Sequence, residues 1–358
     1  MKKKLLIVLF VLYIFGFGIA SLFNHETISF SERRELASFP SIMTSTNKFN
    51  TKFFDELDKY FSDHFIWRDE FRMLKAAFVN DVFMMSDNNK IFTSNDYIFE
   101  MDPKIKDESV KHFIDITSTV IDKYFEGYDV YYSLIPRKND YLLDNEHPDF
   151  KYQDMYQLLD SQIDYPIIDL YNTLNLNSYY RTDIHWRSEK LGPIASVIMN
   201  AMGDEYHEVS FVENTYAPFY GALYAKAASL IEPDKLVYLT SDLLDSVNVY
   251  SLEDNANVPI YDLKELEGID AYSVFVDGPT AYLEITNDKA INDETLIIFR
   301  DSYTSSLLPH LMTNYRKLQV VDIRYIGSQY LDQITFDEDA KVLFIYGLEV
   351  VNNSYSLK

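Results

Sequence analysis

Apolar and polar positions follow two different periods from residue 101 onward. Helical spacing of apolar side chains predicts helices over residues 107–125, 151–161 and 190–202. Short apolar runs predict strands at residues 130–135, 167–170, 295–299, 318–323 and 342–346. Because helices and strands alternate, the sequence predicts an α/β fold in which a parallel sheet is flanked by helices.

The first residues carry the most apolar stretch of the chain. Lys2, Lys3 and Lys4 precede an uncharged run of nineteen residues from Leu5 to Phe23. A helix of that length spans about 28 Å, close to the ~30 Å hydrocarbon core of a bilayer. The lysines place the N-terminus in the cytoplasm, so we expect a single-pass cell-membrane protein with an extracytoplasmic C-terminal domain. A cleaved signal peptide is the alternative, because Gly18 and Ala20 supply an approximate A-x-A site.

Two further regions lie outside the alternating pattern. Residues 47–85 have apolar side chains at helical spacing, which predicts one broken or two successive amphipathic helices, and residues 88–100 predict a hairpin. Residues 205–290 are strand-rich and lack a strong helical pattern, so they are interpreted as a β-rich insertion or a β-rich subdomain. The predicted organisation is an N-terminal anchor, a helical and hairpin region, the first part of the main domain, the insertion and the second part: 1–30, 31–100, 101–204, 205–290 and 291–358.

Composition limits the class of protein. Hydrophobic residues make up 47% and aromatic residues 16% of the 358, which predicts a globular body. The absence of cysteine excludes disulfides, thiolate metal sites and a cysteine nucleophile, and it favours a Gram-positive bacterial host for an exported protein. A net charge of −24 makes nucleic acid a poor partner, because phosphate binding depends on clustered Lys and Arg.

Two segments carry candidate catalytic residues. The first is Thr182-Asp183-Ile184-His185-Trp186, in a loop before a predicted helix. Residues two apart in an extended segment point to the same side, so the carboxylate of Asp183 can orient the imidazole of His185. An Asp-x-His pair also arises by chance, and a surface loop or a half-buried structural histidine explains it equally well.

The second segment is Ile297-Ile298-Phe299-Arg300-Asp301-Ser302-Tyr303. Its apolar strand delivers Ser302 to the carboxyl end of the sheet, where open α/β sheets bind their ligands. Ser302 can attack an acyl carbon if His185 acts as general base, Asp183 orients His185, and backbone N–H groups near Ser302 and Tyr303 hold the oxyanion. The structural alternative is a serine that caps the following helix.

Taken together, the two segments resemble the DHHW family of membrane-anchored proteins, which is similar to the SGNH-like alginate O-acetylation proteins. In these relatives an Asp-x-His-Trp element precedes an Asp-Ser-Tyr/Phe element, as in a circularly permuted SGNH hydrolase. Further matches extend the resemblance from about residue 30 to the C-terminus: Ser31 to Leu36, Tyr60 to Arg68, Phe219 to Leu223, Tyr272 to Phe275 and Asp322 to Tyr325.

The resemblance implies an SGNH-hydrolase-like three-layer fold and an acyl-transfer enzyme with Ser302 as nucleophile, His185 as base and Asp183 as orienting residue. It implies an acetyl group, a cell-surface glycan as substrate, and water or a sugar hydroxyl as acceptor. The protein would then be an acetylesterase or an O-acetyltransferase, with a membrane-bound O-acyltransferase as partner. No cofactor is implied. The second letter of the family name is Ile184 here, which removes one possible metal ligand.

Several other residues are candidates for substrate binding. Trp186 and Tyr303 are candidates for a sugar-stacking wall, and Arg137 and Lys138 follow a predicted strand at the same edge of the sheet. Asn352 and Asn353 are candidates for a further oxyanion donor. Two other functions stay open: an inactive scaffold or glycan-binding protein, and a transferase of D-alanyl groups to teichoic acid.

Overall fold

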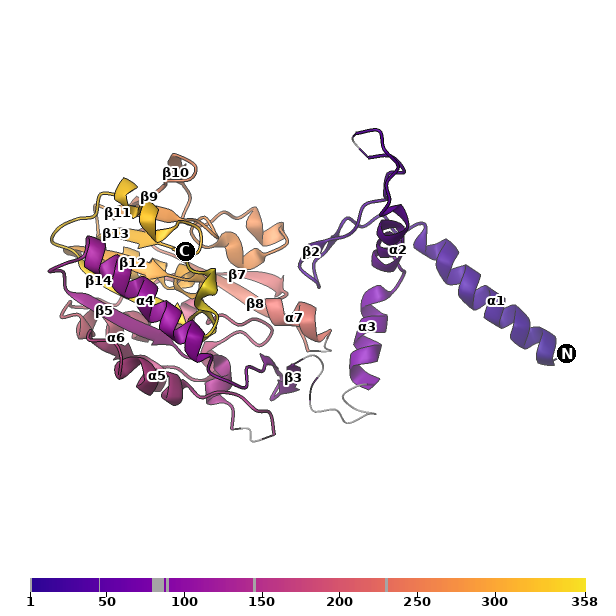
Figure 1. The fold of residues 1–358 in the computed structure, drawn as a ribbon, viewed down its shortest axis with the longest axis horizontal. Coiled ribbons are helices and arrows are strands. Elements are labelled where there is room, and N and C mark those ends of the chain that lie inside the picture. Colours follow the sequence, from indigo (N-terminus) through magenta and orange to yellow (C-terminus); the bar gives the residue numbers. More distant parts are fainter. Residues whose placement is uncertain (1, 45, 79–86, 88–89, 144–145, 229–230) are drawn as a thin grey trace.

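An eight-stranded mixed sheet runs through the globular body (Figure 1), in the order β10-β9-β11-β13-β12-β14-β5-β6. Its strands are β5 (Val130–Ile135), β6 (Ile167–Asp169), β9 (Val247–Ser251), β10 (Ala256–Val258), β11 (Tyr282–Asn287), β12 (Asn292–Arg300), β13 (Tyr315–Val321) and β14 (Lys341–Gly347). The five strands from β13 to β6 are parallel, whereas β11, β9 and β10 pair antiparallel. This computed structural model describes residues 2–44, 46–78, 87, 90–143, 146–228 and 231–358.

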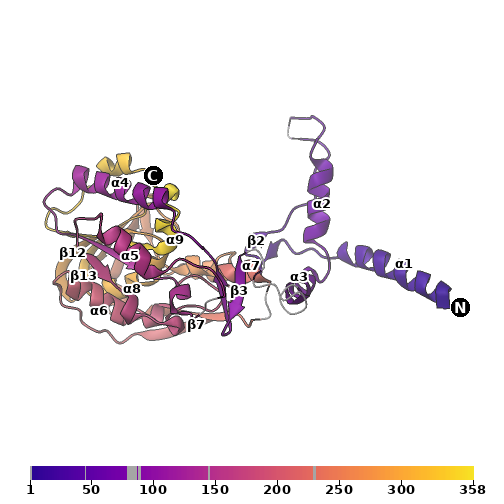
Figure 2. The same cartoon turned by 60° about the horizontal axis from the view of Figure 1, so that its bottom comes forward.

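Helices cover both faces of this sheet. Successive residues of β12 point to opposite faces, as the twofold repeat of a strand requires. Ile297 and Phe299 pack with α4 (Asp107–Tyr124) and α5 (Tyr152–Asp160), while Leu296 and Ile298 pack with α6 (Gly192–Ala201) and α8 (Leu308–Met312). Figure 2 shows α4 and α6 on opposite sides of the sheet. The predicted α/β class and the three-layer arrangement are therefore confirmed.

The region 205–290 differs from the predicted insertion. Only β7 (Val212–Phe219) and β8 (Asp234–Thr240) form a separate two-stranded sheet, with the short helix α7 (Ala222–Ala227) between them. Strands β9, β10 and β11 extend the main sheet, because β11 pairs with β13 over five residue pairs from Tyr282–Val321 to Thr286–Lys317. Much of this region is thus part of the main sheet rather than an insertion beside it.

The N-terminal region extends away from the body (Figure 1). It contains α1 (Lys2–Ser21), the short strands β1 (Ile28–Ser29) and β2 (Arg34–Glu35), and the helices α2 (Phe53–Asp63) and α3 (Arg68–Ala77). Two successive helices are therefore confirmed, and the end of the predicted stretch, residues 79–85, lies outside the described residues. The predicted hairpin is present as β3 (Ile91–Ser94) and β4 (Tyr97–Glu100), and Asn95 and Asp96 at its turn have φ of 51° and 62°.

The apolar segment predicted as a membrane anchor is helical in α1. Within the part of the chain that the structure describes, no helix meets the length and apolar character needed to cross a membrane. The side chains at positions 7–9 and 11–14, inside the predicted span, lie outside the described residues. The anchor stays a prediction from the sequence.

Candidate active site

The residues on either side of the loop that carries Asp183 and His185 pair with each other and so hold the two ends of the loop together. Tyr179 and Trp186 form an antiparallel bridge, and the Tyr180 N–H donates to the His185 carbonyl at 3.1 Å. At the tip, both the N–H and the hydroxyl of Thr182 donate to Asp234 Oδ2, at 2.7 and 2.6 Å. Because Asp234 begins β8, the loop is fixed to the two-stranded sheet as well as to its own base.

Ser302 follows the central strand β12 directly. Asp301 caps the 3₁₀ helix Ser302–Ser306, since its Oδ1 accepts the Tyr303 N–H at 3.0 Å. Its Oδ2 accepts the Gly347 N–H at 2.6 Å and so ties this turn to the end of β14. Burial raises the pKa of Asp301, although Arg324 and these two N–H groups oppose the rise. Asp301 therefore positions the serine turn at the carboxyl edge of the parallel strands.

The structure brings Ser302, His185 and Asp183 together. His185 Nε2 lies 2.9 Å from Ser302 Oγ, and His185 Nδ1 lies 2.6 Å from Asp183 Oδ1. An Nδ1–H that donates to the carboxylate leaves Nε2 free to accept the serine proton, which is the tautomer a general base needs. Residues separated by 117 positions thus form the hydrogen-bonded chain that the sequence predicts.

Asp183 is fully buried and held as a carboxylate. Its Oδ1 also accepts the His185 N–H at 3.0 Å, while Oδ2 accepts the Ala222 N–H at 2.6 Å and lies 3.2 Å from an Arg33 guanidinium nitrogen. Burial alone would raise the pKa of Asp183, but the charge and hydrogen bonds of His185, together with Arg33, hold it well below its usual range. The charged form is therefore available to orient His185.

Gly221 lies in the segment from Phe219 to Leu223 that resembles the DHHW family, and the structure shows why a glycine is needed there. A Cβ at Gly221 would lie 2.3 Å from the Thr182 carbonyl oxygen and 2.5 Å from Asp183 Cβ, so a side chain does not fit there. This close approach lets the next N–H, that of Ala222, reach Asp183 Oδ2 at 2.6 Å. The glycine is required because two backbones meet at this point.

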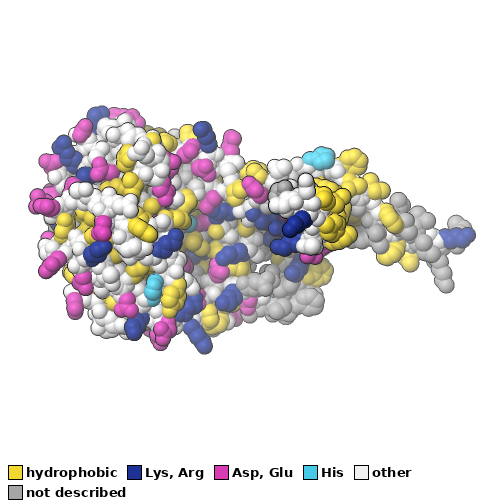
Figure 3. Space-filling view, turned by 45° about the horizontal axis from the view of Figure 1, so that its top comes forward, with side chains coloured by type: hydrophobic (Ala, Val, Ile, Leu, Met, Phe, Trp, Pro, Cys, Tyr) yellow, Lys and Arg dark blue, Asp and Glu magenta, His cyan; other side chains and the backbone are white. Residues whose placement is uncertain are grey.

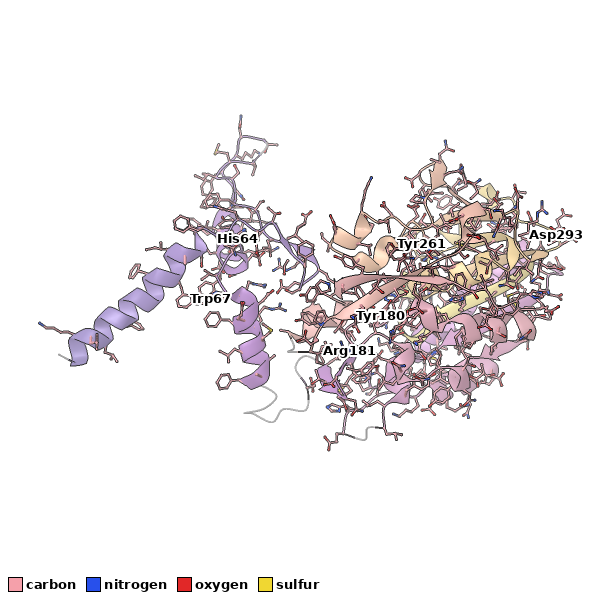
Figure 4. All side chains as sticks on the ribbon, turned by 180° about the vertical axis from the view of Figure 1, so that it is seen from behind. His64, Trp67, Tyr180, Arg181, Tyr261 and Asp293 are labelled. Atoms are coloured by element: carbon pink, nitrogen blue, oxygen red, sulfur yellow. The ribbon has the colours of Figure 1, made fainter. Side chains whose placement is uncertain are left out.

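Lys138 and Arg137 are buried and their side chains are hydrogen-bonded inside the protein, so their predicted role in substrate binding stays a prediction. Lys138 Nζ donates to the carbonyls of Tyr180, Arg181 and Asp183, at 3.1, 3.0 and 2.7 Å. Figure 4 shows Tyr180 and Arg181 on the side of the body that faces the N-terminal region. Burial lowers the pKa of Lys138 to about 7. Arg137 pairs with Asp149 at 3.0 Å. Lys138 therefore fixes the backbone of the histidine loop, and Arg137 forms a buried ion pair.

Trp186 and Tyr303 are also buried, so they do not form a wall open to a sugar. The Trp186 indole N–H donates to the Tyr303 carbonyl at 2.7 Å, and the Tyr303 hydroxyl donates to the Ile184 carbonyl at 2.9 Å. These contacts join the histidine loop to the serine turn. Ile184 itself packs against a small apolar cluster that includes Ile91 and Leu223, and so offers no metal ligand.

Tyr272 is a residue of the site that our sequence analysis did not single out. Its ring stacks on the His185 imidazole with centroids 3.9 Å apart and an angle of 11°, and its hydroxyl donates to Ser306 Oγ at 2.9 Å. Tyr272 lies in the segment from Tyr272 to Phe275 that resembles the DHHW family, and this resemblance was the one sign in the sequence that pointed to it. A flat buried ring on one face of the imidazole restricts the rotation of His185.

Two of the predicted oxyanion donors are already used. The Tyr303 N–H donates to Asp301 Oδ1, as described above. Asn352 is fully buried and donates to Asp102 Oδ2 and the Lys104 carbonyl, at 2.7 and 2.9 Å. The Asn353 amide donates to the Glu349 carbonyl at 2.8 Å. The Ser302 N–H and Asn353 stay predictions as oxyanion donors.

A cavity of about 680 Å³ lies between the N-terminal region and the body. Its lining includes Phe30 from one side and Tyr216, Tyr220 and Ala271 from the other. Ala271 lies next in sequence to Tyr272, but Asp183, His185 and Ser302 are not part of the lining. Among the described residues, no group of three or more His, Asp or Glu side chains is arranged to hold a metal ion.

The body is thus a three-layer α/β fold with a Ser–His–Asp chain at the carboxyl edge of its parallel strands. The family model described as "DHHW protein" matches residues 152–321, a range that includes Asp183, His185 and Ser302. The resemblance to the DHHW family that the sequence predicts is therefore confirmed.

Solved structures agree on the fold. A DHHW family protein from Eubacterium siraeum is 18% identical, with a TM-score of 0.61 over 75% of this chain and 94% of that chain. Bacillus cereus PatB1, solved with a sulfonyl adduct, is 18% identical, with a TM-score of 0.56 over 73% of this chain and 95% of that one. The O-acetyltransferase domain of Pseudomonas putida AlgJ is 12% identical, with a TM-score of 0.45 over 74% of this chain and 93% of that one. No curated protein matches the chain.

Proposed function

We propose that this protein is a Ser–His–Asp acyl-transfer enzyme that moves an acetyl group to or from a cell-surface polysaccharide. The observation that carries the proposal is the continuous hydrogen-bonded chain from Ser302 Oγ through both ring nitrogens of His185 to Asp183 Oδ1, with distances of 2.9 and 2.6 Å. A serine in this arrangement is activated by its neighbouring base.

The reaction follows from the positions of these atoms. His185 Nε2 takes the Ser302 proton as Oγ bonds to the acyl carbon, and the same proton then goes to the leaving group as the donor ester bond breaks. In the second half, a water or sugar hydroxyl gives its proton to His185 and attacks the acyl-enzyme. The Ser302–acyl bond breaks and Ser302 Oγ recovers the proton. Asp183 stays ionised throughout and stabilises the imidazolium.

The acetyl group and the glycan acceptor rest on the family resemblance and on the cavity between the N-terminal region and the body. Aromatic side chains such as Phe30, Tyr216 and Tyr220 line it, and an aromatic lining suits the apolar faces of an uncharged sugar. Acidic side chains are scattered over the body surface (Figure 3), which disfavours strongly anionic acceptors. A membrane-bound O-acyltransferase that supplies acetyl groups across the membrane is the partner we propose.

A sulfonyl fluoride provides a direct test of the nucleophile. Such reagents sulfonylate activated serines, and PatB1 is known with a sulfonyl adduct. Incubation of the full chain should give one covalent adduct, which peptide mass spectrometry places on Ser302. The Ser302→Ala variant should stay unlabelled. Labelling of other serines at equal rates, with Ser302 unmodified, would contradict an activated nucleophile and favour the scaffold alternative.

The extracytoplasmic location is proposed from the sequence pattern of residues 1–23 alone. A reporter enzyme that is active only outside the cytoplasmic membrane should be active when it is fused after Lys358. A reporter that works only in the cytoplasm should be inactive at the same position. The reverse pattern of reporter activity would overturn the proposed topology without affecting the chemistry of Ser302.

A further inference from the structure

A short segment of the N-terminal region reaches the catalytic carboxylate. Strands β1 and β2 pair through Ile28–Glu35 and Ser29–Arg34, and the turn between them is closed by the Arg33 N–H, which donates to the Phe30 carbonyl at 3.2 Å. We call residues 28–35 the arm. Arg33 has φ of 53°, in the left-handed region that is uncommon for a residue with a side chain. The turn conformation is therefore one that the surrounding contacts must support.

Ion pairs brace the arm against α2 and α3. Glu32 pairs with Arg34, Arg68 and Arg72, at 2.6, 2.5 and 2.7 Å. Arg34 also makes two hydrogen bonds to Asp63, at 2.9 and 2.5 Å, and this contact lowers the pKa of Asp63 to about 2. Figure 3 shows basic side chains gathered on the N-terminal region next to the body. Bidentate and networked pairs fix geometry better than single surface pairs do.

The Arg33 side chain contacts the body. One guanidinium nitrogen lies 3.2 Å from Asp183 Oδ2, and the other forms an ion pair with Asp270. The Arg33 side chain is 13% exposed and that of Asp183 is fully buried. A cation from the N-terminal region thus contacts the oxygen of Asp183 that does not face His185.

We infer that Arg33 is a positioning residue for the triad, and that the arm, held by its ion pairs to α2 and α3, places Arg33 against Asp183. By holding Oδ2, the guanidinium fixes the plane of the Asp183 carboxylate so that Oδ1 faces His185 Nδ1. Its positive charge also stabilises the charged form of the buried Asp183 carboxyl, whose pKa it helps to hold well below the usual range, so that Asp183 stays ionised at lower pH. This inference rests on the proposed function for its catalytic meaning, and it couples the membrane-proximal region to the rate of acyl transfer.

Other charged or titratable groups also surround Asp183 and His185. They come from the strands and loops packed on this site: Lys138 at the Asp183 carbonyl, Asp234 at Thr182, Asp270 beside Arg33, Tyr272 on the imidazole, Asp301 and Tyr303 in the serine turn, and Glu349 next to the Tyr303 hydroxyl. None of these groups places a second cation at Asp183 Oδ2. Asp270 loses its ion-pair partner when Arg33 is changed, so the effect of Arg33→Ala includes that loss.

The test compares Arg33→Ala and Arg33→Lys with Arg316→Ala in the full chain, using a small aryl acetate. Arg316 is an exposed arginine paired with Asp293 far from the site, so its variant is the matched control. Arg33→Ala should lower kcat roughly 10- to 100-fold with KM little changed, because the base is misplaced rather than the substrate lost. The acid limb of its pH profile should move to higher pH. Arg33→Lys should recover part of both effects.

Unchanged kcat and an unchanged acid limb in Arg33→Ala, with the fold intact by circular dichroism, would overturn the inference. Glu32→Gln, which loosens the brace without touching the body, should give a smaller shift in the same direction. If it has no effect while Arg33→Ala does, the bracing part of the inference is wrong.

A readout that needs no turnover separates this inference from the proposed function. In proton NMR at one fixed pH, the downfield signal of the His185 Nδ1–H, assigned by its loss in His185→Gln, should shift and broaden in Arg33→Ala, because the Asp183 carboxylate that accepts this proton is no longer held. That change is expected even if no acetyl ester is hydrolysed. Identical signals in the two proteins would contradict the inference independently of any activity.

Discussion

Ser302→Ala should reduce hydrolysis of an aryl acetate by at least about 10³-fold relative to the unmodified chain, because no other group can form the acyl bond at this position. The fold should be unaffected. Ser302 is only partly buried at the start of its 3₁₀ helix, and the cap of that helix comes from Asp301 rather than from the serine hydroxyl. Initial rates with a chromogenic acetate, together with thermal unfolding, measure both quantities.

The matched control for this variant is Ser161→Ala. Ser161 is an exposed serine whose hydroxyl donates to the Leu158 carbonyl at the end of α5, so its loss should leave the rate unchanged. If Ser302→Ala and Ser161→Ala hydrolyse the ester equally fast, the enzyme interpretation fails. The protein is then better described as a scaffold or glycan-binding protein with an SGNH-like fold.

Asp183→Asn should lower kcat by about 10³- to 10⁴-fold while the site keeps its shape. An asparagine amide is isosteric with the carboxylate, but it can donate to His185 Nδ1 and so favours the tautomer in which Nε2 carries the proton. Nε2 then has no lone pair for Ser302. The variant also leaves the Arg33 guanidinium without its anionic partner at 3.2 Å, so a modest loss of stability accompanies the loss of rate.

Asp293→Asn serves as the control for Asp183→Asn, because Asp293 is a surface aspartate paired with Arg316. It should retain full activity. Steady-state kinetics at several pH values distinguish a tautomer defect from a binding defect, since the former lowers kcat and the latter raises KM. A wild-type rate in Asp183→Asn would show that the aspartate has no part in orienting the base.

The five parallel strands and the helices α4, α5 and α6 were predictable because each has a clear period and a hydrophobic face. For example, β5 was predicted at residues 130–135 and is observed as Val130–Ile135, while α4 was predicted at 107–125 and is observed as Asp107–Tyr124. The region 205–290 was harder to interpret because an alternating pattern predicts a strand but does not indicate which other strand it pairs with. Nothing in the residues of β11 indicates that it pairs with β13, more than 30 positions later in the chain.

The three residues of the triad could be proposed from the sequence because their chemistry is local: Asp183 and His185 share one loop, and Ser302 follows an apolar strand. The burial of Lys138, Trp186 and Tyr303 could not be deduced, because the same side chains serve equally well on a surface. Lys138 in particular donates to three carbonyls of the histidine loop, a role set by tertiary geometry alone. Arg33 lies 150 positions from Asp183, and its contact emerges only in the folded chain.

Trapping the acyl-enzyme tests the central claim most directly. The full chain is mixed with an activated acetyl ester, quenched in acid within the first turnover and digested for peptide mass spectrometry. The account predicts an acetyl group on the peptide that contains Ser302, lost on longer incubation and absent from Ser302→Ala. Rapid turnover of the ester with no acetyl group on Ser302, or with the acetyl group on another residue, would contradict it.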